Sequence, residues 1–556
     1  MPEGRATFSG FRLVDGYVAN SANSKVLMRL LLYSIPCLLA FAGHALELPA
    51  IFSHHMVLQQ DTAVPVWGQA EPGATVKLTF GDQTHDAVAN DAGAWRVTLA
   101  PMISATAGRE LAITAEWPAA DENSDPGFAA VVFGDVVVGE VWLGSGQSNM
   151  AGTMARYAPF DRELLDAQLK GPYPEIRLCG KSWSLADMDS IDGFSALLFA
   201  FGMDLYAHRG GPIGLIMRAE PGSPAGRWLT QAALDADSDA QAMLEAFAET
   251  YDFDELELGY EVELAGWIAG TESEQSPKPP LDTGECEGGI GSLYSSEIAP
   301  IAPYAIRGVL WDQGESGPGI VGLDMATAMS TLINSWRAAW DEDLPFIYMQ
   351  KPNGDGAIWG EDSLPAARLP LYPPLPHEGA EREQYSLMLR IPHTAMAISS
   401  DLDNGLHPRR KLPYARRFAA AARSLVYEEK LATQGPTYSS HKREKDGIVV
   451  RFNHVGDGLV ARGAETIQGF MLAGKDEEWH WAEGRIEGED TVLLTCEAIR
   501  KPVAIRYAWA AECPWANLFN SDQLPALTFR TDDWPLEPEV VEEEVVDEPD
   551  LPAADF

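Results

Sequence analysis

GEVWLGSGQSNMAG, residues 139–152, places one serine directly after an apolar segment and inside a glycine turn. The apolar run within residues 136–143 predicts a buried strand. Gly144 and Gly146 allow backbone angles that turn the hydroxyl of Ser148 outward, as hydrolases require of a nucleophile. The alternative interpretation is a polar turn that caps a helix, since Ser and Asn are favoured at such positions.

Strands alternate with helical patterns on the C-terminal side of this stretch, over residues 136–432. Such alternation predicts a parallel sheet whose functional sites lie at the carboxyl ends of the strands. The predicted strands are 212–217, 305–311, 344–350 and 394–400, and the clearest predicted helices are 326–340 and 412–429.

Short runs with a period of two flank this region on both sides. They occupy residues 46–135 and 433–534, and each set predicts a β-sandwich-type module. The acidic stretch 235–282 interrupts the alternating pattern, and we expect it to be a surface excursion. The sequence therefore predicts an α/β domain between two β modules.

Composition limits the possible partners of the chain. Its 556 residues are too many for one core, and the 46% of hydrophobic residues suffice to build several. A formal net charge of -42 argues against a nucleic-acid partner, because a phosphate backbone demands a basic surface. A neutral or small substrate fits better. The last segment, 535–556, is acidic and poor in large apolar residues, which predicts a disordered tail.

The N-terminal 45 residues carry an export pattern. Lys25 and Arg29 precede the apolar run 30–42, and the small residues at 43–45 resemble a signal-peptidase site. We expect a signal peptide at about 28–45 and a periplasmic or secreted mature protein. The apolar run is too short to remain as a membrane helix, so we expect no membrane insertion after its removal.

Four cysteines remain once the predicted signal, which contains Cys37, is removed. In an oxidising compartment Cys496 and Cys513 are the first choice for a disulfide, because they are close in sequence and lie in one predicted β module. A bridge between Cys179 and Cys286 is the second choice. None of the cysteine spacings resembles a zinc site.

A nucleophilic serine needs a base and an acid that orients it. Among the eleven histidines, His407 follows the predicted strand 394–400 and an acidic turn, which places it at the same kind of strand end as Ser148. Asp403 is the first candidate for the orienting acid and Asp401 the second. A turn-forming role for these carboxylates is an equally good interpretation.

Donors for an oxyanion are available on two further loops at strand ends. Gln313 follows the strand 305–311, and its side-chain amide can donate. Gly222 follows the strand 212–217, and its backbone N–H can donate. Either loop, taken alone, is also a common turn.

Several blocks in one order resemble the sialate O-acetylesterase family, a branch of the SGNH-type esterases. They cover nearly the whole mature chain up to the tail. The blocks are GEVWL…GQSNM (139–150), WDQGES (311–316), LHP (406–408), LPAIFSHHMVLQQ (48–60) and the segments 293–304 and 517–530.

The resemblance implies an SGNH-hydrolase-like three-layer domain in which Ser148 is the nucleophile and His407 the base. It assigns the oxyanion contacts to Gly222, Gln313 and the Ser148 amide, with no cofactor or metal. The chain departs from the family where residues 219–223 lack a Gly-Gly pair, and at Asn404, where many SGNH enzymes have the triad Asp.

The function that this resemblance implies is hydrolysis of O-acetyl groups from a sugar, with O-acetylated sialic acid as the first candidate substrate. Acetylated xylan or another polysaccharide is the alternative, because β modules can bind carbohydrate. A catalytically silent glycan-binding protein is the second alternative.

Overall fold

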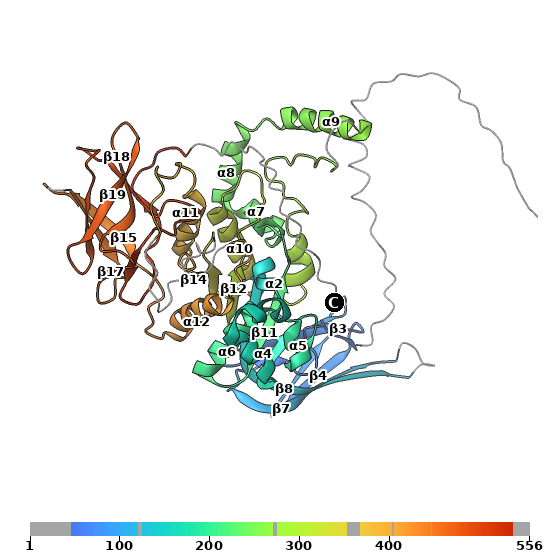
Figure 1. Cartoon of the computed structure of the whole chain (residues 1–556). Helices are drawn as coiled ribbons and strands as arrows, with labels where there is room; N and C mark the ends of the chain where they lie inside the picture. The colour runs from blue at the N-terminus through green and yellow to red at the C-terminus, as the bar shows by residue number, and fades with distance from the viewer. Residues whose placement is uncertain are drawn as a thin grey trace, which may run out of the picture. The chain divides into compact units, whose positions relative to one another are not determined.

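The computed structural model describes residues 46–119, 125–270, 275–352, 367–402, 405–445 and 447–536 of the chain (Figure 1). The predicted signal segment, Asp403 and all but the first two residues of the predicted tail lie outside the described residues.

The N-terminal region is built of β-strands, as predicted. A three-stranded antiparallel sheet has the order β1-β3-β6, whereas β4 pairs with β5 and β7 in a second group. Burial alternates along β4, as the period of two predicts. The strands are β1 (Leu46–Glu47), β2 (Val57–Gln59), β3 (Val64–Ala70), β4 (Thr75–Phe80), β5 (Gln83–Val88), β6 (Ala94–Leu99) and β7 (Ala105–Trp117).

One long strand, β8 (Gly127–Gly146), connects this region to the central sheet. Its first part pairs antiparallel with β7, and its last part pairs parallel with β11 (Ile213–Ala219) and β12 (Gly308–Asp312). Asp135 has a φ of 55° within this strand, in the left-handed region, and its carboxylate accepts a hydrogen bond from Arg177 at 3.2 Å. The predicted boundary at residue 135 thus falls inside one continuous strand.

The central sheet has the strand order β10-β9-β11-β8-β12-β13-β14. All neighbours are parallel except β10 and β9, which are antiparallel. The remaining strands are β9 (Tyr173–Cys179), β10 (Trp183–Ala186), β13 (Phe346–Met349) and β14 (Thr394–Ala397). The predicted α/β class and parallel sheet are therefore confirmed, and β8 lies in the middle.

Helices cover both faces of this sheet. Trp142 on β8 packs in the core that contains α6 (Ala196–Arg209) and α12 (Leu412–Tyr427), whereas Val141 and Leu143 pack in the core that contains α10 (Met325–Trp340). This alternation follows from the two-residue period of a strand. The arrangement has three layers.

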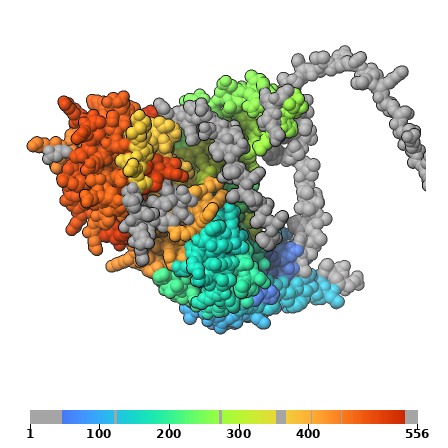
Figure 2. Space-filling model, in the orientation of Figure 1, coloured from blue at the N-terminus to red at the C-terminus, as the bar shows by residue number. Residues whose placement is uncertain are grey.

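The shorter helices lie in the connections between these elements. The acidic excursion is helical, and its last helix, α9, buries none of its residues; Figure 2 shows the green segment around it at the surface. These helices are α2 (Ser148–Ala151), α3 (Met154–Tyr157), α4 (Arg162–Lys170), α5 (Met188–Asp192), α7 (Gln231–Ala236), α8 (Ser238–Ala248), α9 (Phe253–Ala269) and α11 (Ala380–Leu387), with a π-helical turn at Tyr294–Ile298.

The C-terminal region is a seven-stranded antiparallel sheet with the order β15-β16-β20-β19-β18-β21-β23, accompanied by the pair β17-β22. Aromatic side chains such as Phe452, Phe470 and Phe529 fill its core. The strands are β15 (Thr437–Arg443), β16 (Ile448–Asn453), β17 (Leu459–Ala461), β18 (Ile467–Ala473), β19 (Trp479–Ile486), β20 (Thr491–Thr495), β21 (Ala504–Tyr507), β22 (Leu518–Asn520) and β23 (Phe529–Arg530).

The predicted disulfides are absent from the described residues, because none of Cys179, Cys286, Cys496 and Cys513 is bonded to another cysteine. The prediction of a Cys496–Cys513 bridge is therefore wrong for this structure. The reason is positional: Cys496 follows β20 and lines one cavity, whereas Cys513 lies in the loop after β21 and lines another. Closeness in sequence did not place the two sulfur atoms together.

None of the described helices combines the length and the apolar character that crossing a membrane requires.

Candidate active site

Three strand ends meet at one edge of the central sheet. The last residues of β11 and β12, Ala219 and Asp312, both lie in register with Gly146 at the end of β8. The loops that carry Ser148, Gly222 and Gln313 therefore leave the sheet side by side. This is the carboxyl edge, where open α/β sheets bind their ligands.

The turn that presents Ser148 depends on Gly146. Its φ of +123° and its close approach to β12 both exclude a side chain, because a Cβ would lie 2.2 Å from the carbonyl oxygen of Asp312. The next residue, Gln147, donates its backbone N–H to the same oxygen at 2.9 Å. Ser148 then begins α2 as a half-buried residue.

His407 contacts the predicted nucleophile directly. Its Nε2 lies 2.8 Å from Ser148 Oγ, although 259 positions separate the two residues in the chain. His407 reaches this place on the loop between β14 and α12, and its side chain is partly buried. A hydroxyl in hydrogen-bond contact with an imidazole is the arrangement in which a base can activate a serine.

The surroundings of His407 favour its neutral form. Burial lowers the pKa of His407, and the positive charges of Arg156, Lys411 and Lys351 lower it further. The carboxylate of Glu315 has the opposite effect. Neutral imidazole is the form that accepts a proton, so these groups keep the base active at a lower pH than an ordinary histidine would allow.

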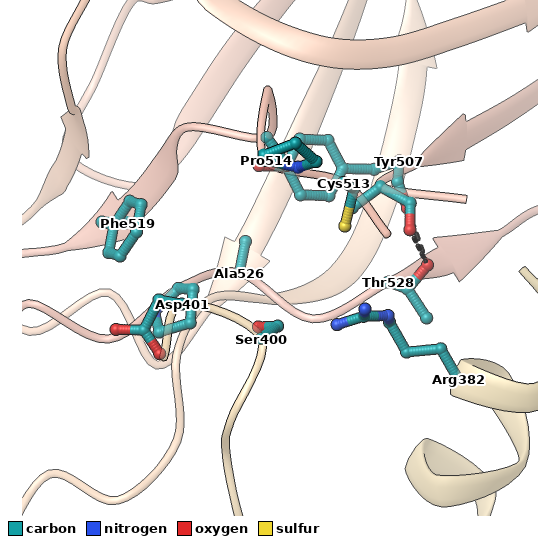
Figure 3. Close-up of a pocket in the computed structure, with 12 residues that line it drawn as sticks. Arg382, Ser400, Asp401, Tyr507, Cys513, Pro514, Phe519, Ala526 and Thr528 are labelled. Atoms are coloured by element: carbon teal, nitrogen blue, oxygen red, sulfur yellow. Dashed lines mark hydrogen bonds between the residues drawn. The ribbon is translucent and has the colours of Figure 1, made fainter. Parts of the chain in front are cut away.

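The second candidate acid, Asp401, is not brought to His407. It is buried and accepts a hydrogen bond from Arg417 at 2.8 Å. Figure 3 shows it in a pocket together with Tyr507 and Thr528 of the C-terminal region and with Arg382 of α11. The first candidate, Asp403, lies outside the described residues. Within the described part of the chain, no carboxylate forms an ion pair with His407.

The two candidate oxyanion residues differ in their exposure to solvent. Gly222 is exposed, with a φ of +70°, and nothing crowds its Cα. Gln313 is completely buried, and its side-chain amide donates to the carbonyl oxygens of Gly317 at 2.9 Å and Ser223 at 3.4 Å. In this geometry the Gln313 amide connects the loop that carries Gly222 to its own loop.

A buried network of charged and polar side chains lies beside Ser148, and the sequence analysis did not identify it. The Nζ of Lys351 lies 2.6 Å from Oδ1 of Asp312 and 2.6 Å from Oε1 of Glu315. Asn149, the residue after Ser148, donates its amide to the same Oε1 at 2.7 Å. Lys351 and Asp312 are almost completely buried.

Asn149 also holds the loop that carries His407. Its amide nitrogen donates to the carbonyl oxygen of Leu406 at 2.9 Å, one residue before His407. Its amide oxygen accepts a hydrogen bond from Lys411 at 2.6 Å. The side chain of Asn149 therefore contacts both Glu315 and the segment that carries His407.

The charges in this network stabilise one another. Burial alone would raise the pKa of Glu315, but the charge and hydrogen bond of Lys351 outweigh it and lower this pKa. Burial likewise opposes the charge of Lys351, whose pKa is nevertheless raised by Asp312 and Glu315. Burial lowers the pKa of Lys411 to about 7. The first two groups are thus ionised at neutral pH.

The sequence contained a partial signal for this network. Glu315 lies in the block WDQGES, from which only Gln313 was chosen as a candidate. Lys351 directly follows the predicted strand 344–350, a place where functional residues gather. Lys411 has no such signal, because only the folded chain brings it to Asn149.

A metal site is not formed by the residues that the structure describes: no group of three or more His, Cys, Asp or Glu side chains is arranged to hold an ion.

Comparison with known proteins identifies the type of enzyme. No protein-family model matches the chain. Sialate O-acetylesterases from Rattus norvegicus and Homo sapiens are each 25% identical to it, cover 88% and 89% of the chain, and are themselves covered to 94%. A carbohydrate acetylesterase from Xanthomonas citri has a crystal structure that matches with a TM-score of 0.68 and 26% identity, over 88% of this chain and 100% of that one.

Together with these relatives, the fold and the site define a carboxylic ester hydrolase. Its similarity to sialate O-acetylesterases extends over most of the chain, which supports the resemblance that its sequence blocks indicate.

Proposed function

We propose that the protein is a serine esterase that hydrolyses O-acetyl groups from a sugar, with Ser148 as nucleophile and His407 as general base. The observation that carries the proposal is the 2.8 Å contact between His407 Nε2 and Ser148 Oγ at the carboxyl edge of the central sheet. The names of the relatives, which are sugar acetylesterases, support the same chemistry.

The proposed reaction has two stages. His407 takes the proton of Ser148 as Oγ attacks the acetyl carbonyl carbon, and the carbon–oxygen bond to the sugar then breaks while the imidazolium returns the proton to the sugar oxygen. Water, deprotonated by His407, next attacks the acetyl-serine. Acetate leaves, and Ser148 recovers its proton.

The oxyanion of each tetrahedral intermediate needs nearby donors. We assign this role to the backbone N–H groups of Ser148 and Gly222, neither of which donates to a backbone acceptor among the described residues. Gln313 remains a predicted third donor. Its present contacts with Gly317 and Ser223 also support a role in positioning the Gly222 loop.

We propose Asp403 as the acid that orients His407, as in the sequence analysis. The pairing of Asp401 with Arg417 supports a structural role for that carboxylate. The charge of Glu315 acts on His407 and favours the imidazolium that forms during the reaction.

We further assign residues 136–432 to the SGNH type of hydrolase, between β modules at 46–135 and 433–534. The support is the parallel sheet, with the serine directly after its middle strand. Export to the periplasm or the medium is proposed from the signal-peptide pattern at 28–45.

The relatives indicate an acetylated sugar as substrate without indicating which sugar. The names of the curated relatives make O-acetylated sialic acid the first sugar to test. Acetylated xylan or another polysaccharide is the alternative, because the Xanthomonas citri relative is named a carbohydrate acetylesterase. A silent glycan-binding protein would bind such sugars without releasing acetate.

An aryl-acetate assay tests the chemistry independently of the sugar. We expect the purified protein to release acetate from 4-nitrophenyl acetate, and Ser148→Ala to lower kcat by about 10³-fold or more. The exposed Ser440 in β15 provides a matched control, because Ser440→Ala should change nothing. Full activity in a folded Ser148→Ala variant would exclude the mechanism, and an inactive wild type would favour the silent binder.

A further inference from the structure

A cleft of about 490 Å³ opens at the carboxyl ends of β9 and β11. Its walls come from the end of β11 and the next residue (217–220), from the two residues that come after β9 (180–181), from the π-helical turn and the three residues after it (296–301), and from the N-terminal residues 50–51. The volume lies within the range of small-molecule binding sites.

One wall of this cleft continues into the nucleophile turn. Glu220, which lines the cleft, donates its backbone N–H to the carbonyl oxygen of Gly146 at 3.1 Å, two residues before Ser148. Gly222, the proposed oxyanion donor, lies two residues further along the chain. A molecule whose acetyl group lies at Ser148 therefore has this cleft next to it.

The charged groups that line the cleft balance one another. Lys181 and Arg218 are opposed by Glu220 and Glu297. Arg218 is largely engaged already, because its guanidinium donates to the carbonyl oxygens of Met217, at 2.7 Å, and Gly180, and its Nε lies 3.9 Å from Glu297. The cleft thus offers carboxylate acceptors and one ammonium donor, without a surplus of positive charge.

Such a lining suits a neutral sugar better than an anionic one. Hydroxyl groups both donate and accept, so they can bond to carboxylates and to an ammonium group. The apolar side chains of Ala50, Met217 and Pro300, which are at least partly exposed, can contact the C–H faces of a pyranose ring. A sugar carboxylate would instead lie near Glu220 and Glu297, on a chain with a net charge of -42.

We propose that this cleft binds a neutral pyranose unit of an acetylated oligosaccharide or polysaccharide while the acetyl group occupies the Ser148 site. The proposal rests on the proposed esterase function and specifies its substrate class. Sialic acid, which carries a carboxylate, is the disfavoured substrate.

Two neighbouring serines provide a matched test of the cleft. Ser296 is exposed and lines it, whereas Ser295 is exposed and is not among its lining residues. Ser296→Trp should fill the cleft and lower kcat/KM for acetylated xylo-oligosaccharides by about tenfold or more, through KM, with 4-nitrophenyl acetate turnover changed less than about twofold. Ser295→Trp should change neither value. Retained aryl-acetate turnover shows that each variant is folded.

A comparison of substrates on the wild type tests the charge argument. We expect kcat/KM for acetylated xylo-oligosaccharides to exceed that for O-acetylated sialic acid by about tenfold or more. Unchanged oligosaccharide kinetics in Ser296→Trp, or faster turnover of the sialic acid, would overturn the cleft proposal alone. Failure of the wild type on 4-nitrophenyl acetate would instead overturn the esterase function.

Discussion

At the scale of residues, the site places a histidine with a lowered pKa among charged side chains. His407 reaches Ser148 through Nε2, while Lys411, Lys351, Arg156 and Glu315 set the electrostatic potential at its ring. Three of these four charges are positive, and burial acts in the same direction. The base is therefore available over a wider pH range than a solvent-exposed histidine.

The pH dependence of kcat/KM provides a test, because two substitutions should shift it in opposite directions. Because the pKa of His407 is lowered, the acid limb of kcat/KM should lie below the ordinary histidine value of about 6.5, and activity should fall as the pH drops through it. Lys411, with a pKa of about 7, is mostly protonated there. Lys411→Met should therefore move the limb to higher pH, and Glu315→Gln to lower pH.

The two candidate acids should behave differently on substitution. Asp401→Asn weakens a buried charge-assisted hydrogen bond to Arg417, so it should lower the free energy of unfolding by about 1–3 kcal/mol and leave kcat nearly unchanged. Asp403→Asn should lower kcat by up to about 10⁴-fold, if it acts as the acid of a serine triad, with little effect on stability. Thermal melts and initial rates of both variants decide between them, and a large kcat loss in Asp401→Asn would reverse the assignment.

At the scale of elements, the turn between β8 and α2 positions Ser148 through backbone contacts. Gly146 has no room for a Cβ against β12, and Gln147 is hydrogen-bonded to the same strand. The loop of His407 is held to α2 through Asn149. The position of Ser148 relative to His407 is therefore determined by three elements that are distant in sequence.

Gly146→Ala should disrupt this turn. The left-handed φ and the 2.2 Å approach to Asp312 O require the backbone to move, which should cost more than about 1 kcal/mol and lower kcat strongly. Gly193→Ala is the control, because nothing lies within 4 Å of a Cβ at that position and its φ is negative. Equal activity of the two variants would contradict the proposed rigidity of the turn.

The sequence allowed the main elements of the central sheet to be predicted, but not the buried network. The strands around Ser148, the helices 326–340 and 412–429 and the contact of Ser148 with His407 were predictable, because periodicity and strand ends are local features. The network of Lys351, Glu315 and Lys411 was not, since its members lie on three loops that are far apart in the chain. The disulfide prediction was wrong for a related reason: chain separation does not measure distance in space.

At the scale of the whole molecule, the last described residues pack against the C-terminal sheet. Asp532 pairs with Arg506 at 2.8 Å, and both side chains are 1% exposed. Trp534 packs its ring against Trp479 and accepts a hydrogen bond from Arg530. The acidic residues after Trp534 were predicted to contribute nothing to a core.

Two truncated chains test which of the C-terminal residues contribute to stability. A chain that ends at Trp534 should keep its melting temperature and activity. A chain that ends at Thr531 loses Asp532 and leaves the buried guanidinium of Arg506 without this partner, so its free energy of unfolding should fall by about 3–5 kcal/mol. Circular dichroism melts and aryl-acetate rates measure both. Unfolding of the longer chain would show that the tail is structural.

The continuity of β8 has a consequence for how the enzyme can be dissected. A fragment that begins after Asp135 would keep every candidate catalytic residue, yet it would cut β8 where β7 and β2 pair with it. The exposed strand edge would offer unpaired N–H and C=O groups and apolar side chains to other molecules, which promotes aggregation. Ser148 and the N-terminal strands therefore belong to one folding unit. Recombination or domain grafting should preserve activity only when the junction between the two parent sequences lies before Leu46.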